Sequence, residues 1–81
     1  MIIATQIKDI LSSITEEYPD IFEQKMTDDE KLSMLTSESM LALEFVISLE
    51  DEFSIEFDDD EIDMNFFNNL KTLTSIIEKY L

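Results

Sequence analysis

Ser39 is the residue of this chain whose surroundings most clearly suggest chemistry. It lies in the segment TSESMLALEF, between Glu38 and Met40, at the start of an apolar run. A serine hydroxyl becomes a nucleophile when an adjacent base takes its proton, and a triad hydrolase also needs a glycine-containing turn around the serine. The chain contains no histidine, no cysteine and no glycine. A stand-alone hydrolase is therefore disfavoured, and we do not expect the chain to be an enzyme.

Two interpretations of Ser39 remain open at this point. Serine is favoured near helix N-termini, so an ordinary capping serine is the simpler one. The other is a hydroxyl that a separate enzyme modifies. A phosphate ester suits a helix N-terminus, because the unpaired N–H groups and the positive end of the helix dipole stabilise its negative charge.

An acidic run, DDDEID at residues 58–63, raises the question of calcium binding. An EF-hand loop needs oxygen ligands at fixed spacing and a glycine at its sharp turn. Glycine is absent from the chain, and Ile62 occupies a position where a ligand is expected when counting from Asp58. We therefore interpret the run as a solvated face and predict no dedicated metal site.

The charge of the chain is strongly one-sided, with a formal net charge of −15 and lysine as its only basic residue type. Such a surface repels nucleic acid and anionic lipid, and it attracts basic patches on other proteins. Between Lys31 and Lys71 there are 11 acidic residues and no basic one. Because self-repulsion destabilises a fold, this asymmetry favours a role in docking onto basic partners over a role in solubility alone.

The hydropathy of the chain predicts a single domain at residues 1–81 that does not enter a membrane. No apolar run is long enough to span a bilayer. The opening segment MIIATQIKDIL lacks the basic start and the cleavage site of a signal peptide, so we expect a cytoplasmic protein. The phenylalanines are expected to form the core, because no basic residues are interleaved among them as a base-stacking surface requires.

Three stretches with helical periodicity predict an all-α fold. The first runs from Ile3 and ends before Pro19, because proline disfavours helix in the residue that precedes it. The second covers residues 39–53. The third covers residues 70–80, with Thr72 as its expected N-cap.

The two connections between these stretches lack a sustained period. Residues 18–37 are expected to form a long connection, anchored by Ile21, Phe22, Leu32 and Leu35. A structureless connection of that length is unusual in a compact domain, which suggests that the fold or the function requires it. Residues 54–69 are expected to hold one short helix with irregular flanks.

The predicted helix at residues 39–53 has two distinct faces. At about 100° per residue, one face carries a core stripe that consists of Ala42, Phe45, Val46, Leu49 and Phe53. Roughly opposite lies a half-apolar, acidic stripe of Met40, Glu44 and Asp51, with Ile47 at its edge. This second stripe is expected to be exposed and to lie near Ser39.

The segment ESMLALEFVISLEDEF at residues 38–53 resembles the signature segment of acyl carrier proteins. In that family an Asp-Ser-Leu or Asp-Ser-Met triplet opens the second helix, and an acidic pattern that ends in phenylalanine follows. Here Glu38, Ser39 and Met40 take the place of the triplet. The segments IEFDDDEI and NFFNNLKTLTSIIEKYL are similar to the family's third-helix approach and last helix. Glutamate before the serine, methionine after it and Thr36 in place of the usual glycine suggest a specialised rather than a housekeeping carrier.

The resemblance implies a small four-helix bundle of acyl-carrier type, up-down, with a long loop between helices 1 and 2. It implies that Ser39 carries 4′-phosphopantetheine, attached through a phosphodiester by a phosphopantetheinyl transferase. Acyl groups then travel on the thiol of this arm as thioesters, in fatty-acid, polyketide or related biosynthesis. The missing cysteine and histidine fit this role, because the sulfur comes with the cofactor and the reactions occur in partner enzymes.

The resemblance also implies a surface for the transferase and for acyl-processing enzymes with basic docking patches. Its expected residues are Glu38, Met40, Glu44, Ile47 and Asp51. The acyl chain is expected near a bundle interior lined by Leu43, Val46 and Phe57, and a monomer is expected for a charged shuttle. Two alternatives stay open: an aminoacyl carrier, and an acidic protein-interaction module with a carrier-like fold that is never modified.

Overall fold

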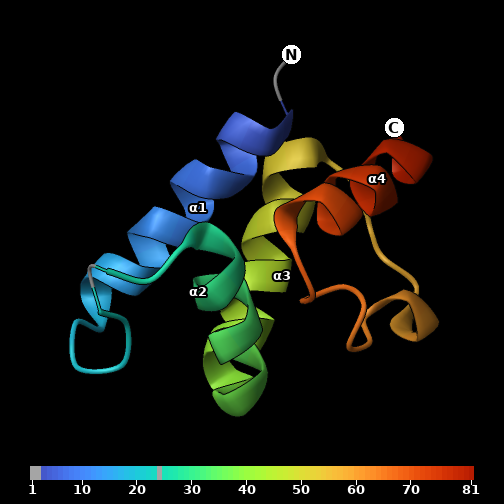
Figure 1. Cartoon of the computed structure of the whole chain (residues 1–81). Coiled ribbons are helices and arrows are strands. Elements are labelled where there is room, and N and C mark those ends of the chain that lie inside the picture. The colour runs from blue at the N-terminus through green and yellow to red at the C-terminus, as the bar shows by residue number, and fades with distance from the viewer. Residues whose placement is uncertain (1–2, 24) are drawn as a thin grey trace.

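The computed structural model describes residues 3–23 and 25–81, which contain four α-helices (Figure 1). In chain order these are α1 (Ile3–Glu17), α2 (Asp28–Met34), α3 (Ser39–Phe53) and α4 (Leu70–Tyr80). Short 3₁₀ helices cover Leu35–Ser37 and Asp59–Glu61. The described residues contain no β-strand, so the prediction of an all-α fold is confirmed. Within these same residues, no helix combines the length and the apolar character that crossing a bilayer requires.

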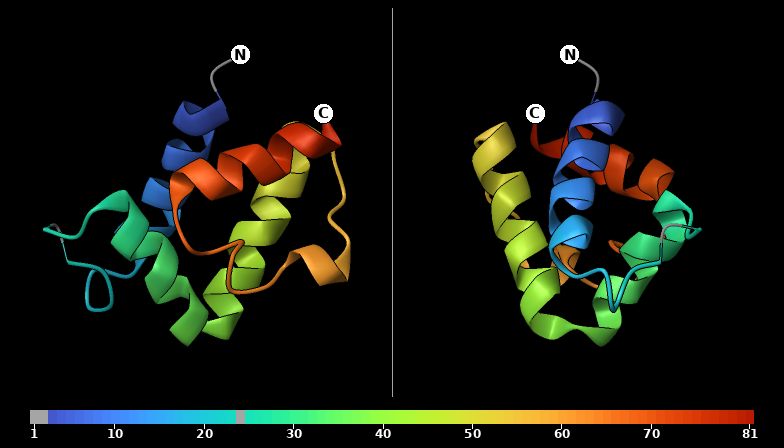
Figure 2. Two further views of the ribbon diagram at one scale, coloured as in Figure 1. Left: turned by 45° about the vertical axis from the view of Figure 1, so that its right-hand side comes forward. Right: turned by 90° about the vertical axis from the view of Figure 1, so that its left-hand side faces the viewer.

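α1 and α3 form where the periodicity predicts them. α1 ends at Glu17, shortly before Pro19, and buries Ile7, Leu11 and Ile14 on one face. α3 spans residues 39–53, and most of its predicted core stripe is buried: Phe45, Val46, Leu49 and Phe53. α1 packs against α2, α3 and α4, and the core lies among these four helices (Figure 2).

The long irregular connection predicted for residues 18–37 is corrected by the structure, because its second half is helical. α2 begins with a capping box, in which Thr27 Oγ1 accepts from Glu30 N at 3.1 Å and Glu30 Oε1 accepts from Thr27 N at 2.8 Å. A capping box satisfies two backbone donors at once and starts a helix without a long apolar period. The predicted anchors hold the segment to the core: Phe22, Leu32 and Leu35 are buried and Ile21 is partly buried.

The connection between α3 and α4 contains one short helix with irregular flanks, as predicted, and this helix is of the 3₁₀ type. Residues 54–69 contain the 3₁₀ turn Asp59–Glu61 followed by further turns. The segment starts at Ser54, which caps α3 in the left-handed conformation with φ 53° and ψ 47°. Glycine usually occupies such a position, but this chain has none. The chain then returns along α3, where Phe57 N donates to Glu50 Oε2 at 2.9 Å.

Side chains of α4 hold the acidic part of this connection in place. Tyr80 Oη accepts a hydrogen bond from Asp58 N at 3.2 Å. Lys79 Nζ lies 2.7 Å from Glu61 Oε1, and this hydrogen-bonded ion pair raises the pKa of the lysine ammonium above its usual value. One of the five basic residues of the chain therefore ties the acidic connection to the C-terminal helix.

A cluster of aromatic rings joins α3, the connection and α4. The ring centroid of Phe66, a fully buried residue, lies 5.1 Å from that of Phe57 and 5.0 Å from that of Phe67. The Phe67 ring in turn lies 6.5 Å from that of Phe45 on α3, and the Phe57 ring lies 5.2 Å from that of Tyr80 on α4. The prediction that the phenylalanines form the core is confirmed for these residues, and their edge-to-face contacts add to the stabilisation that burial provides.

The N-cap of α4 is Asn69 and not Thr72, which corrects the prediction. Asn69 Oδ1 accepts a hydrogen bond from Thr72 N at 2.8 Å, so Thr72 is the donor of the capping bond. Asparagine is among the best N-cap residues, and its extended backbone here is typical of that position. A second acceptor comes from α2, where Asp29 Oδ1 accepts from Leu70 N at 2.9 Å.

We expect Asn69→Ala to lower the free energy of unfolding by about 1 kcal/mol, because Thr72 N then loses its acceptor. Urea unfolding followed by circular dichroism measures this change. Asn68→Ala, at the exposed neighbouring position, is the matched control and should change the free energy by less than about 0.5 kcal/mol. Equal losses in the two variants would contradict the assignment of the cap.

Candidate functional site

Ser39 is the first residue of α3, and its side chain is exposed. The 3₁₀ turn Leu35–Ser37 joins α2 to α3 at one end of the molecule, where the two helices meet in a V (Figure 2). In the part of the chain that the structure describes, no side chain caps α3, and Glu38 at the N-cap position makes no capping hydrogen bond. The first-turn N–H groups of α3 therefore have no capping side chain. Ser39 lies beside these N–H groups, at the positive end of the helix dipole.

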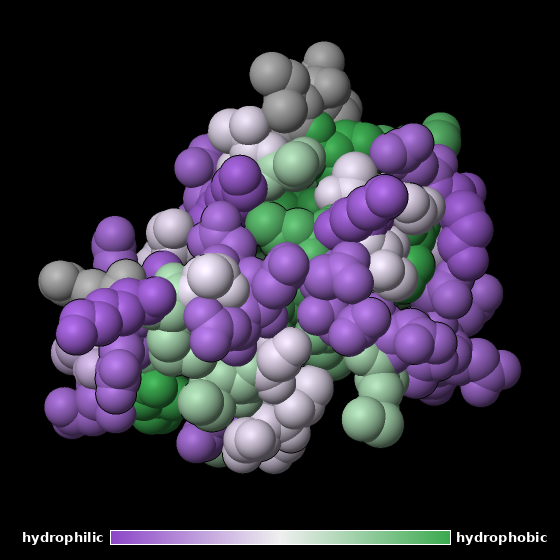
Figure 3. Space-filling view, viewed as in Figure 1, coloured by the Kyte–Doolittle hydropathy of each residue, from purple (hydrophilic) through white to green (hydrophobic). Residues whose placement is uncertain are grey.

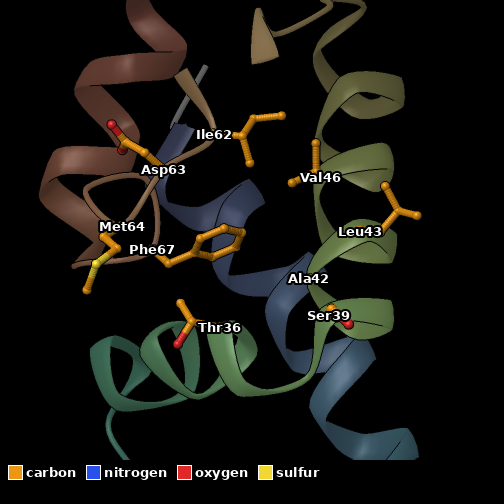
Figure 4. A pocket seen from close by; sticks show the side chains of 9 residues that line it. All are labelled: Thr36, Ser39, Ala42, Leu43, Val46, Ile62, Asp63, Met64 and Phe67. Atoms are coloured by element: carbon orange, nitrogen blue, oxygen red, sulfur yellow. The ribbon is translucent and has the colours of Figure 1, made fainter. Parts of the chain in front are cut away.

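An apolar groove begins at Ser39 and runs along α3 (Figure 4). It has a volume of about 380 Å³ and is open to solvent. One wall comes from α3, which contributes Ser39, Ala42, Leu43 and Val46. The other wall comes from the connection to α4, which contributes Ile62, Asp63, Met64 and Phe67. The 3₁₀ turn before α3 contributes Thr36. The volume lies in the range of small-ligand sites.

A second hollow continues from this groove along α3. It shares Leu43, Val46 and Ile62 with the groove and has a volume of about 560 Å³. Four acidic residues also line it, namely Glu50, Asp51, Glu56 and Asp59. The surface along α3 therefore changes from apolar beside Ser39 to carboxylate-edged farther along the helix.

The half-apolar, acidic stripe predicted on α3 is exposed, as expected. Met40 is 85% exposed and Ile47 is 48% exposed, while Glu44 and Asp51 are exposed beside them. Among the expected partner-binding residues, Glu38 is the one that is partly buried. Large apolar side chains that are exposed together with charged ones are typical of protein-binding surfaces.

Hydrophilic side chains also crowd the side of the molecule where the acidic connection meets the C-terminal helix (Figure 3). Asp58, Asp59 and Asp60 of the connection are all exposed there. The exposed carboxylates are therefore not confined to α3, because the connection to α4 adds these three. Together they increase the long-range attraction of a basic partner.

The predicted interior position of Leu43 was wrong, and Leu41 was missing from the predicted core stripe. Leu43 was expected in an interior lined also by Val46 and Phe57, but it is 61% exposed and forms the outer edge of the groove. Val46 and Phe57 are buried, as predicted. Leu41, which the predicted core stripe omitted, is only 7% exposed. Its position four residues before Phe45 was the signal for this face, because residues four apart lie on the same side of a helix.

The far wall of the groove was not predicted as part of a site. Ile62, Met64 and Phe67 come from a segment without periodicity, about 25 residues after the serine in the sequence. Met64 is 85% exposed at the edge of the groove, whereas Phe67 is 7% exposed at its base. Phe67 was expected only as a core residue, but in the structure it is both a buried core residue and part of the groove lining.

The acidic run at residues 58–63 does not converge on one point. Glu61 is paired with Lys79, and Asp63 Oδ1 accepts hydrogen bonds from Asn65 N at 2.9 Å and from Phe66 N at 3.3 Å. Over residues 3–23 and 25–81, no three acidic side chains are placed to share one metal ion. Asp63 forms a turn and Glu61 forms an ion pair, so both have structural roles.

The orientation of α3 can be tested with two leucines that lie two positions apart. We expect Leu41→Ala to lower the free energy of unfolding by about 2–5 kcal/mol, because it leaves a cavity in the core. Leu43→Ala removes the same atoms from an exposed site and should change it by less than about 0.5 kcal/mol. Urea unfolding of both variants measures the difference, and similar losses would mean that α3 presents a different face to the core.

No protein-family model, no curated protein sequence and no solved structure matches this chain. The resemblance to acyl carrier proteins therefore rests on the residues of the sequence itself, with the segment around Ser39 as its specific part. What the chain does has to be inferred from these residues and from the site that they form.

Proposed function

We propose that the chain is an acyl carrier protein, with Ser39 as the attachment point of a 4′-phosphopantetheine arm. The observation that carries the proposal is the position of this serine. It is exposed, it opens α3, and it lies at the start of an apolar groove, within a segment that resembles the carrier signature. The arm, once attached, supplies a thiol that holds acyl groups as thioesters.

The surroundings of Ser39 fit a phosphodiester. Among the described residues, no side chain competes for the first N–H groups of α3, because Glu38 makes no capping hydrogen bond. These donors and the helix dipole stabilise the negative charge of a phosphate group attached to the Ser39 oxygen. Because the side chain is exposed, a separate enzyme can reach the hydroxyl and supply the base that the chain lacks.

The exposed stripe of α3 supplies a docking surface next to the attachment point. Glu44 and Asp51 attract a basic rim, and Met40 and Ile47 provide apolar contact at its centre. Contacts of this kind give fast, salt-sensitive association and permit dissociation, which a carrier that visits several enzymes requires. We infer that the partners are a phosphopantetheinyl transferase and acyl-processing enzymes with basic patches, and that the carrier is a cytoplasmic monomer.

The fold that we propose is an acyl-carrier type of helical bundle with one local difference. The resemblance implies a long loop before the serine-bearing helix and a short helix after it. Here the short helix, α2, precedes Ser39, and the connection after α3 has only a 3₁₀ turn. The groove beside the serine is therefore bounded on one side by turns, whose shape depends on their side-chain contacts.

An unmodified acidic interaction module is the second candidate function. The observation in its favour is that the docking surface does not require a modified serine, because Met40, Glu44, Ile47 and Asp51 are exposed in the bare chain. Glutamate before the serine, where the carrier motif has aspartate, also favours it. An aminoacyl carrier would use the same serine and differ only in its cargo.

Incubation with coenzyme A and a phosphopantetheinyl transferase should increase the intact mass by one phosphopantetheine group. Ser39→Ala should remain unmodified, because the acceptor hydroxyl is gone. Ser37→Ala is the matched control, since Ser37 is also exposed and lies two residues earlier, and it should be modified at the wild-type rate. If a panel of transferases leaves the wild type unmodified, or labels another residue, the carrier proposal is wrong.

Charge reversal on the exposed stripe should weaken docking without unfolding the chain. We expect Glu44→Lys with Asp51→Lys to lower kcat/KM for the transferase and to reduce its dependence on salt. The free energy of unfolding should change by less than about 0.5 kcal/mol per substitution, because both residues are exposed.

The control for this pair is Asp9→Lys with Glu78→Lys. It changes the net charge equally, at exposed positions of α1 and α4. Kinetics over a range of salt concentrations compare the two double variants. Equal losses in both would show that only the total charge matters and that α3 is not the docking surface.

A further inference from the structure

We propose that the groove beside Ser39 selects short acyl cargo and that Phe67 is the residue that sets the length limit. This inference rests on the proposed carrier function. Ser39 itself lines the groove, so an apolar chain tethered at this residue has an apolar surface within reach. Ala42 and Val46 continue that surface along α3, and burial of methylene groups against it is favourable.

The aromatic ring of Phe67 closes the base of the groove and is packed against other buried rings. Phe67 is 7% exposed, and its ring centroid lies 5.0 Å from that of the fully buried Phe66. The ring centroid of Phe45, also a fully buried residue, lies 6.5 Å from that of Phe67. Close-packed interiors tolerate additional volume poorly. An acyl chain therefore lies in the groove above Phe67 and does not pass into the core.

The route along α3 is unfavourable for a longer chain. Beyond Val46 the groove opens into the second hollow, where Glu50, Asp51 and Glu56 line the path. Methylene groups placed there either stay in contact with water or displace water from carboxylates. Neither outcome gives the favourable free energy of burial that the apolar groove beside Ser39 provides. The outer edge offers no further cover, because Leu43 is 61% exposed and Met64 is 85% exposed.

The groove can be tested without the prosthetic arm. The chain has no cysteine, so Ser39→Cys introduces a single thiol. Its thiolate attacks the sulfenyl sulfur of an n-alkyl methanethiosulfonate, a disulfide forms, and methanesulfinate leaves. A series of alkyl lengths then places chains of known size at the start of the groove, and urea unfolding reports how far each chain is buried.

We expect the ratio of folded to unfolded protein to increase by up to about fourfold per methylene while the chain fits, and then to stop increasing. Phe67→Ala, combined with Ser39→Cys, should move this limit to longer chains, because it removes the ring at the base. Phe67→Leu is a milder variant to use if the alanine variant does not fold. Phe22→Leu is the control, since Phe22 is buried outside the groove; it should lower stability and leave the limit unchanged.

A continued increase up to long alkyl chains, no increase at any length, or a limit that Phe67 substitutions do not move would overturn the inference. The same series, loaded on Ser39 from acyl-coenzyme A by a transferase, should also show a limit that Phe67→Ala moves, at a chain length that the intervening arm shifts. If loading fails while the alkyl conjugates show the limit, the carrier function is wrong and the groove remains a site for short apolar chains. If loading succeeds and the limit is absent, the carrier function stands and the length selection is wrong.

Discussion

The packing of Phe67 against Phe45 of α3, with Phe66 packed in turn against Phe67, is the interaction on which the candidate site depends. The connection between α3 and α4 has no α-helix, and its backbone alone would not define one wall of a groove. Two buried aromatic side chains fix it against the core, because such rings bury a large apolar area and favour defined edge-to-face geometries. Ile62 and Met64, which lie between the acidic turn and these rings, are thereby placed opposite α3.

The second constraint is the net charge of −15. Mutual repulsion among so many carboxylates opposes a compact fold, so most of them have to remain solvated. Several have structural roles as well: Asp29 accepts from the first turn of α4, Glu50 from Phe57 N, and Asp63 from its own turn. The ion pair of Glu61 with Lys79 contributes modestly to stability, because Lys79 is exposed to solvent.

α3 brings the parts of the proposed carrier together. Its buried face holds the core, one flank lines the groove, and its exposed stripe carries apolar and acidic residues. Ser39 opens the same helix, so the attachment point, the groove and the docking stripe are fixed relative to one another by one rigid element. A carrier needs this arrangement, because a partner that recognises the stripe must also reach whatever is attached to the serine.

The sequence by itself determined the extents of α1 and α3, the place of Ser39 at the start of α3 and the exposed stripe beside it. These features are local, since helical periodicity depends on residues three and four apart. α2 was missed because Thr27 and Glu30 start it through a capping box, a signal that a search for long apolar periods does not detect. Only the tertiary structure decided the groove, because its far wall comes from an aperiodic segment distant in sequence. The burial of Leu41 was open to prediction from its spacing to Phe45, whereas the place of Leu43 at the outer edge of the groove depended on where the connection to α4 lies against α3.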